Sequence, residues 1–133
     1  MSRKETFVFG PQDGVPPRVG PFAHATRFGD LVFVTGQMPT DPATGELVPG
    51  GLLEQAEQVR RNLAAVLDRF GLTWDDALHV RVYLTDFDGF EGFNAAYERW
   101  FTGPLPARTT VGVTGLAVGA LVEVDLVAGV PAS

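Results

Sequence analysis

Apolar residues recur along this chain with two periods, and the change from one to the other separates strands from helices. A period of two, typical of a strand with unlike faces, runs through residues 78–85. Steps of three and four, typical of amphipathic helices, run through 52–70 and 87–101. The other expected strands lie at 6–9, 22–28, 31–35, 107–113 and 121–128. The predicted order is β-β-β-α-β-α-β-β, an α+β fold.

Glycine and proline mark the boundaries between these elements. Residues 10–21 hold three glycines and four prolines, which favours an irregular loop after the first strand. Gly29-Asp30 predicts a tight hairpin, and Gly71 is a natural residue to end the first helix. The last two strands are expected to form a hairpin through 114–120. We expect one domain, 1–133, in which 1–19 form the N-terminal strand and the Pro/Gly-rich loop.

Each expected helix is apolar on one side only, so both helices are predicted to cover one face of a single sheet. The strand at 31–35 is nevertheless apolar on both faces, as in strands that are covered from both sides. The second face of the sheet should therefore also be buried. Self-association is the simplest way to bury it, because a large apolar patch is unusual on a monomer.

Composition excludes several functional classes. The absence of cysteine excludes disulfides and thiolate chemistry, and a net charge of −6 opposes binding to nucleic acid. The N-terminal stretch lacks the apolar core of a signal peptide, and no run approaches the ~20 apolar residues of a membrane span. We expect a cytoplasmic protein without membrane contact. Phosphate-binding loops and metal-ligand spacings are lacking, so no cofactor or metal is expected.

Arg108 is an unexpected cation inside a strand that otherwise suits burial. The alternation places it on one face with Thr110 and Gly112, whose small side chains leave space beside it. A buried guanidinium needs an anionic partner, and its donors suit a carboxylate held at two points. From the residues alone, a structural pair with Glu123 or Asp125, or an exposed position on an edge strand, is favoured over a ligand site.

Glu123 and Asp125 share one face of the last strand, and valines and a leucine occupy the other. An acid pair in such surroundings is where a raised pKa, and with it general acid or base chemistry, becomes plausible. The alternative is a solvated face. The sequence does not show whether Glu123 reaches Arg108 within one chain or across a subunit boundary.

Four motifs together resemble the RidA/YjgF family of reactive intermediate deaminases. They are VTGQMP at 34–39, N-x-x-Y at 94–97, PART at 106–109 and VEVD at 122–125, and the resemblance runs from about Gly20 to Ala128. It implies a chorismate-mutase-like α+β fold assembled as a homotrimer, with three sites in the clefts between subunits. A trimer would cover the second face of the sheet.

The resemblance also implies an activity, the hydrolysis of 2-imino acids and their enamine tautomers to 2-keto acids and ammonia. Enzymes that use pyridoxal phosphate release these substrates, and the hydrolysis itself needs no cofactor. Arg108 corresponds to the arginine that clamps the substrate carboxylate, and Glu123 to the acid that orients or activates water. The corresponding residues that line the cleft are Phe22, Thr35, Gly36, Asn94 and Thr110.

This chain departs from the family pattern at a few positions. Phe22 stands where tyrosine is common, Thr35 where serine is usual, and His24 where glutamine is frequent. These changes leave the clamp intact and affect the range of substrates. Two other functions remain open: a non-catalytic protein that binds a small carboxylate or keto acid and regulates a partner, and a ribonuclease. The net charge of −6 and the lack of a basic stripe or a histidine pair oppose the ribonuclease.

Overall fold

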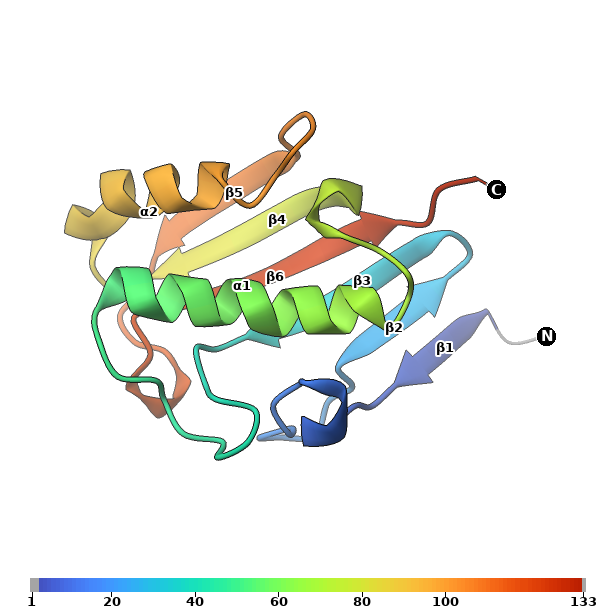
Figure 1. The fold of residues 1–133 in the computed structure, drawn as a ribbon, viewed down its shortest axis with the longest axis horizontal. Coiled ribbons are helices and arrows are strands. Elements are labelled where there is room, and N and C mark those ends of the chain that lie inside the picture. Colours follow the sequence, from blue (N-terminus) through green and yellow to red (C-terminus); the bar gives the residue numbers. More distant parts are fainter. Residues whose placement is uncertain (1–2, 133) are drawn as a thin grey trace.

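The computed structural model describes residues 3–132, which form a six-stranded mixed sheet with two α-helices on one face (Figure 1). The predicted α+β order is confirmed. In chain order the elements are β1 (Lys4–Phe7), β2 (Ala25–Phe28), β3 (Leu31–Gln37), α1 (Leu52–Asp68), β4 (Ala77–Leu84), α2 (Phe90–Glu98), β5 (Ala107–Gly112) and β6 (Val122–Gly129).

Some predicted boundaries differ from the observed ones. The first strand begins at Lys4, two residues before the expected start, and β2 begins only at Ala25. The second predicted helix is two elements: a 3-10 turn at Phe87–Gly89, followed by α2, which ends at Glu98. Gly71 does adopt the left-handed conformation expected after the first helix, with a φ of 71°.

The strand order in the sheet is β1-β2-β3-β6-β4-β5. Strand β6 is antiparallel to both β3 and β4, whereas β5 pairs in parallel with the outer edge of β4. The predicted hairpin between the last two strands is therefore wrong, because β4 lies between them. In the gap between β3 and β4, β6 forms backbone hydrogen bonds along both of its edges, which a terminal hairpin could not provide.

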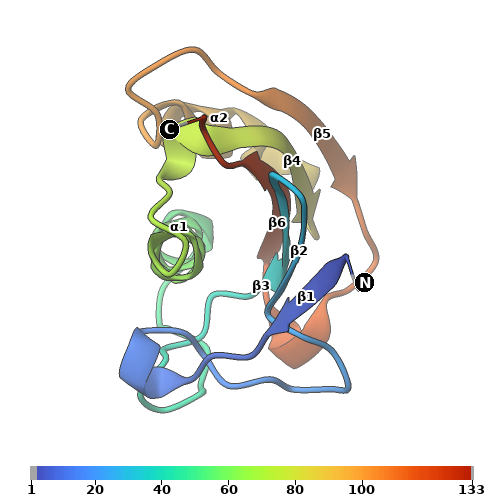
Figure 2. The ribbon, with the colours of Figure 1, turned by 90° about the vertical axis from the view of Figure 1, so that its right-hand side faces the viewer.

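Both helices lie on the same face because of how the chain crosses the sheet. The connections β3-α1-β4 and β4-α2-β5 each join parallel strands and move in the same direction across the sheet. Crossovers of this kind are almost always right-handed, so two that move in one direction place their helices on one side. Figure 2 shows α1 and α2 together on one side of the sheet, as predicted.

Two polar side chains that the pattern of apolar residues did not identify fix α1 to neighbouring segments. Asn62 is fully buried and its Nδ2 donates to the carbonyl oxygens of Met38 (3.0 Å) and Thr40 (2.9 Å), just after β3. The Oε1 of Gln55, also buried, accepts from the backbone N–H of Leu121, just before β6, at 2.8 Å. The helix thus holds the ends of two central strands in register.

No helix covers the other face of the sheet in the described part of the chain (Figure 2). We call it the open face. Large apolar side chains exposed there or at its edges are Phe28, Leu31, Phe33, Leu78 and Val111. The expectation that one chain leaves this face uncovered is confirmed. Within residues 3–132, neither helix has the length and apolar character needed to cross a bilayer.

Candidate functional site

Arg108 lies on β5 and faces the helices. Its register partner on β4 is Val80, which is fully buried, and Thr110 pairs in the same way with buried Val82. Because residues that pair across strands share a face, Arg108 and Thr110 point toward α2. Strand β5 is at the edge of the sheet, so the arginine is only partly buried.

Neutral groups hold the Arg108 guanidinium. Its Nη2 donates to the Oδ1 of Asn94 at 2.6 Å, and its Cζ lies 4.7 Å from the centroid of the Tyr97 ring. The rings of Phe90 and Phe93 each lie 5.8 Å away. No carboxylate within residues 3–132 forms an ion pair with Arg108. The structural pair with an acid of β6, which the sequence favoured, is therefore not formed.

A cleft of about 280 Å³ opens beside the guanidinium. It is lined by Asn94, Tyr97, Glu98, Leu105, Pro106 and Arg108. Arginine carries five N–H donors, and the bond to Asn94 uses one of them. Most of the donors of Arg108 therefore stay available to an acceptor in the cleft. The amide oxygen of Asn94 accepts from Arg108, so this residue helps to hold the guanidinium beside the cleft.

The two acids of β6 have different surroundings on the open face. Asp125 accepts from Arg81 Nε at 2.7 Å and from the hydroxyl of Tyr83 at 3.0 Å. Glu123 has no hydrogen bond or ion pair with any other side chain in residues 3–132. Burial, assisted by the charge of Asp125, raises the pKa of Glu123 above its usual value. Glu123 is thus the unengaged member of the pair, with a pKa shifted toward neutrality.

A bulge in β3, which contains Thr35 and Gly36, brings Gly36 next to Glu123. The pairing of β3 with β6 shifts register between Val34 and Gln37, and such bulges redirect the backbone locally. A Cβ atom on Gly36 would lie 2.9 Å from the Cδ of Glu123, and closer still to its Oε2. Only glycine therefore leaves room for the carboxylate in its present position.

The loop before β2 carries Phe22 to the same region, where it and Gly36 line one small hollow. His24 holds this loop in place. Its Nδ1 accepts from the N–H of Phe9 at 3.0 Å, and its Nε2 donates to the carbonyl of Pro16 at 2.8 Å. Both ring nitrogens are used within the chain and the side chain is buried, so the role of His24 is structural.

The predicted site residues thus form two groups. The arginine cluster, on the helix-covered face, contains Asn94, Tyr97, Arg108 and Thr110. The acid cluster, on the open face, contains Phe22, Thr35, Gly36 and Glu123. Arg108 pairs with Val80 of β4, whereas Glu123 pairs with Tyr83 of β4, whose side chain points to the other face. The clusters therefore lie on opposite faces of the sheet, on strands that are two strand spacings (~10 Å) apart. A single chain does not bring Arg108 and Glu123 together.

Tyr97 belongs to the arginine cluster although it was not among the predicted site residues. Its hydroxyl and that of Thr110 are, within residues 3–132, the buried side-chain oxygen or nitrogen atoms that lack a hydrogen-bond partner. The N-x-x-Y motif was the available signal, because a spacing of three places Asn94 and Tyr97 on one side of a helix.

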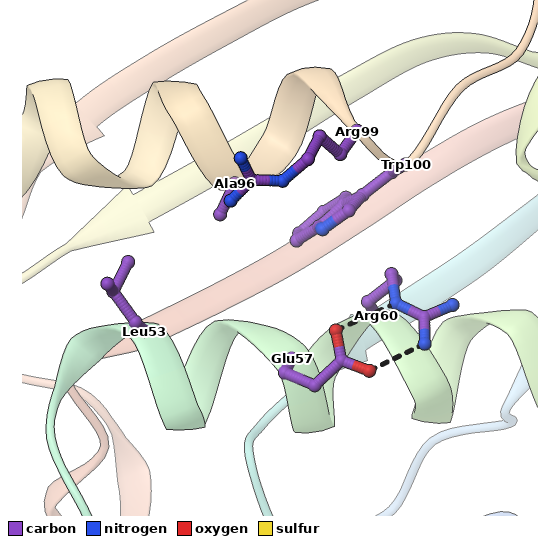
Figure 3. Close-up of a pocket in the computed structure, with 6 residues that line it drawn as sticks. All are labelled: Leu53, Glu57, Arg60, Ala96, Arg99 and Trp100. Carbon is purple, nitrogen blue, oxygen red and sulfur yellow. Dashed lines mark hydrogen bonds and ion pairs between the residues drawn. The ribbon is translucent and has the colours of Figure 1, made fainter.

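A separate hollow of about 290 Å³ lies between α1 and α2 (Figure 3). Glu57 receives two hydrogen bonds from Arg60 there, at 3.0 and 2.6 Å, and a third from Arg61 at 3.0 Å. Within residues 3–132, Glu57 is the one acid that lines the hollow beside Arg60 and Arg99, so an excess of positive charge remains there. It shares no lining residue with the cleft at Arg108.

Comparison with known proteins places the chain among relatives of similar length. A family model described as Endoribonuclease L-PSP matches residues 14–130. The 2-iminobutanoate/2-iminopropanoate deaminase of Mus musculus is 34% identical over 113 residues, which cover 85% of this chain and 84% of that protein.

Two solved structures share the fold. One is YyfA of Yersinia pestis, described as a protein of unknown function of the conserved Rid family (TM-score 0.89, 34% identity, 96% of this chain and 99% of that one). The other is TdcF of E. coli with bound serine (TM-score 0.88, 27% identity, 96% of this chain and 100% of that one).

Proposed function

The chain belongs to the RidA/YjgF family, and we propose that it is a hydrolytic deaminase of 2-imino acids and their enamine tautomers, releasing 2-keto acids and ammonia. The name of the mouse relative supports this substrate class. Enzymes that use pyridoxal phosphate would supply these reactive compounds in the cytoplasm. The deaminase itself would need no cofactor.

The observation that carries the proposal is the state of Arg108. Its guanidinium is fixed beside an open cleft, yet it has no acidic partner in residues 3–132. A partly buried cation in this state favours an anion from outside the chain, and its planar donors suit a carboxylate held at two points. A substrate with a carboxylate next to the reacting carbon is therefore the class that fits best.

A complete site requires a second copy of the chain, and we propose a homotrimer with a site at each subunit interface. The arginine and acid clusters lie on opposite faces of the sheet, and the open face exposes apolar side chains that a neighbour would cover. In such an assembly the arginine cluster of one subunit would meet the acid cluster of another. Neither cluster alone holds both a carboxylate clamp and a free acid.

The chemistry needs a placed water and a proton carrier. With the substrate carboxylate on Arg108, Glu123 would accept a proton as the water oxygen attacks the C2 carbon of the iminium. The nitrogen of the resulting carbinolamine takes the proton held by Glu123, and the C–N bond breaks as the C2 hydroxyl becomes the keto carbonyl. The hydroxyl proton leaves with the ammonia as ammonium. One imino acid and one water give one 2-keto acid and one ammonium ion. The raised pKa of Glu123 makes its carboxylate a better proton acceptor from water than that of an ordinary glutamate.

The test is imine hydrolysis with substrates generated by an amino-acid oxidase or a dehydratase. Arg108→Ala should lower kcat/KM by roughly 30- to 1,000-fold, because it removes a charge-assisted two-point contact. Arg99→Ala is the matched control, since Arg99 is an exposed arginine on the far side of α2. Light scattering should give a trimer for both variants. Wild-type rates in Arg108→Ala would refute the clamp.

Two other functions have specific support. The bound serine in TdcF favours a binding protein without catalysis, and calorimetry with 2-ketobutyrate beside the hydrolysis assay separates binding from turnover. The description of the family model favours a ribonuclease, although a net charge of −6 opposes contact with RNA. Cleavage of RNA by purified protein that persists in Arg108→Ala would support it.

A further inference from the structure

We infer that Tyr97 is a positioning residue of the carboxylate site: its ring holds the Arg108 guanidinium in place without neutralising the positive charge. The inference rests on the proposed carboxylate clamp. It adds a residue that was not among the predicted site residues, and it gives a physical reason for the neutral surroundings of the arginine.

An arginine at the end of an edge strand has to be held before it can bind a ligand with defined geometry. The usual means is an ion pair with a carboxylate, as in the pair between Arg81 and Asp125. Such a pair would fix the guanidinium but would cancel much of its attraction for a second anion. Arg108 makes no pair of this kind, although Glu98 lines the same cleft.

The groups that hold Arg108 instead are an amide oxygen and the faces of aromatic rings. Asn94 accepts one hydrogen bond, and Tyr97 provides the nearest ring, 4.7 Å from the guanidinium carbon. Asn94 and Tyr97 are three residues apart on α2, so they approach the arginine from the same side of the helix. The negative face of a ring attracts a cation but carries no net charge, so it restricts the guanidinium and leaves its charge for the ligand.

The ring of Tyr97, and not its hydroxyl, is the part that serves this role. The side chain is only 4% exposed, and its hydroxyl has no hydrogen-bond partner in residues 3–132. Burial raises the pKa of Tyr97 to about 12, although the nearby charge of Arg108 acts in the opposite direction. The phenol therefore stays neutral at physiological pH and does not act as a proton carrier.

The experiment compares Tyr97→Phe, which keeps the ring, with two variants that remove it, Tyr97→Leu and Tyr97→Met. Phe70→Leu is the control for the loss of a core ring, because Phe70 packs on Phe7 and Phe9 and is not among the rings near Arg108. Methionine fills irregular space, so Tyr97→Met keeps the test valid if Tyr97→Leu fails to fold.

Two measurements are made on each variant. NMR relaxation of the Arg108 side-chain Nε–H reports its order without any ligand. The Kd of 2-ketobutyrate, with kcat and KM for imine hydrolysis, reports ligand binding. Without the ring, the Arg108 order parameter should fall, and Kd and KM should rise by roughly 3- to 30-fold, while kcat changes less. Tyr97→Phe, which keeps the ring, should keep the Arg108 order parameter of the wild type, and Phe70→Leu should match the wild type in both measurements.

An unchanged Arg108 order parameter in both ring-free variants would overturn the inference. So would an equal fall of this order parameter in Tyr97→Phe and Tyr97→Leu, or a wild-type protein that does not bind 2-ketobutyrate. These results are separable from failure of the proposed function. If the wild type binds 2-ketobutyrate but hydrolyses no imine, the deaminase proposal fails, while the order of Arg108 and the Kd still decide the role of Tyr97.

Discussion

Replacing Asn94 with aspartate tests whether the free positive charge of Arg108 is what the site uses. The change is nearly isosteric and places a carboxylate oxygen where the amide oxygen now lies, 2.6 Å from Nη2 of Arg108. The guanidinium would stay in position, because a carboxylate accepts the same hydrogen bond and adds an ion pair. Only its availability to a second anion would change.

The size of the effect follows from the distance between two carboxylates on one guanidinium. At ~5–6 Å and an effective dielectric constant near 20, their repulsion is about 3 kcal/mol. This corresponds to a loss on the order of 10²-fold in kcat/KM, and a similar loss in affinity for 2-ketobutyrate. Asn94→Ala, which loosens the arginine without adding charge, should cost about tenfold.

The assay is therefore a comparison of the two variants by steady-state imine hydrolysis and by calorimetry, with urea denaturation as the control for folding. Asn94→Asp should be the less active variant even though it is at least as stable as Asn94→Ala. If Asn94→Asp matched or exceeded Asn94→Ala in kcat/KM and in affinity, the reasoning that Arg108 binds the substrate carboxylate through its free charge would be refuted.

Four further changes probe other parts of the structure. Gly36→Ala should displace the carboxylate of Glu123 and lower kcat on the order of 10²-fold, while the Tm changes little because the flexible side chain of Glu123 can move away from the new methyl group. A fully active variant would show that the position of this carboxylate is not critical. Glu123→Gln should be inactive. Because the pKa of Glu123 is raised in the folded state, the wild type loses stability as the pH rises from ~4.3, the pKa in the unfolded chain, to the pKa in the folded protein, and Glu123→Gln does not. The variant should therefore gain stability relative to the wild type over this range, and urea titrations at pH 4 and 7 that give the opposite trend would contradict this. Val118→Asn should raise the free energy of unfolding by about 1 kcal/mol, because the exposed Val118 has a φ of 56°, a left-handed conformation that a β-branched residue tolerates poorly. A lower free energy of unfolding in chemical denaturation would argue against backbone strain at this position. Asn62→Ala should lower the free energy of unfolding by roughly 1–3 kcal/mol, because it leaves the buried carbonyl of Thr40 unpaired and removes one of the two hydrogen bonds to the carbonyl of Met38. A change under ~0.5 kcal/mol would show that water replaces the amide.

Local periodicity identified which residues share a face of each strand. The alternation grouped Arg108 with Thr110, and Glu123 with Asp125, and the structure has both groupings. This succeeds because a side-chain period of two is a property of the extended backbone and needs no partner strand. The same holds for the helices, because their apolar stripes follow from 3.6 residues per turn. The apolar pattern does not identify Gln55 and Asn62, which are polar but buried in α1.

What the sequence determined by itself is thus the α+β class, the order of the elements, and the chemistry available to a site without cysteine, metal ligands or phosphate loops. Only the tertiary structure decided that β6 lies between β3 and β4, because strand order depends on hydrogen bonds between segments far apart in the chain. That placement separates Arg108 from Glu123, pairs Asp125 with Arg81, and leaves Glu123 free beside Gly36. Pairing between strands far apart in the sequence decides which arginine and which acid lack a partner within residues 3–132. A local sequence pattern cannot predict this.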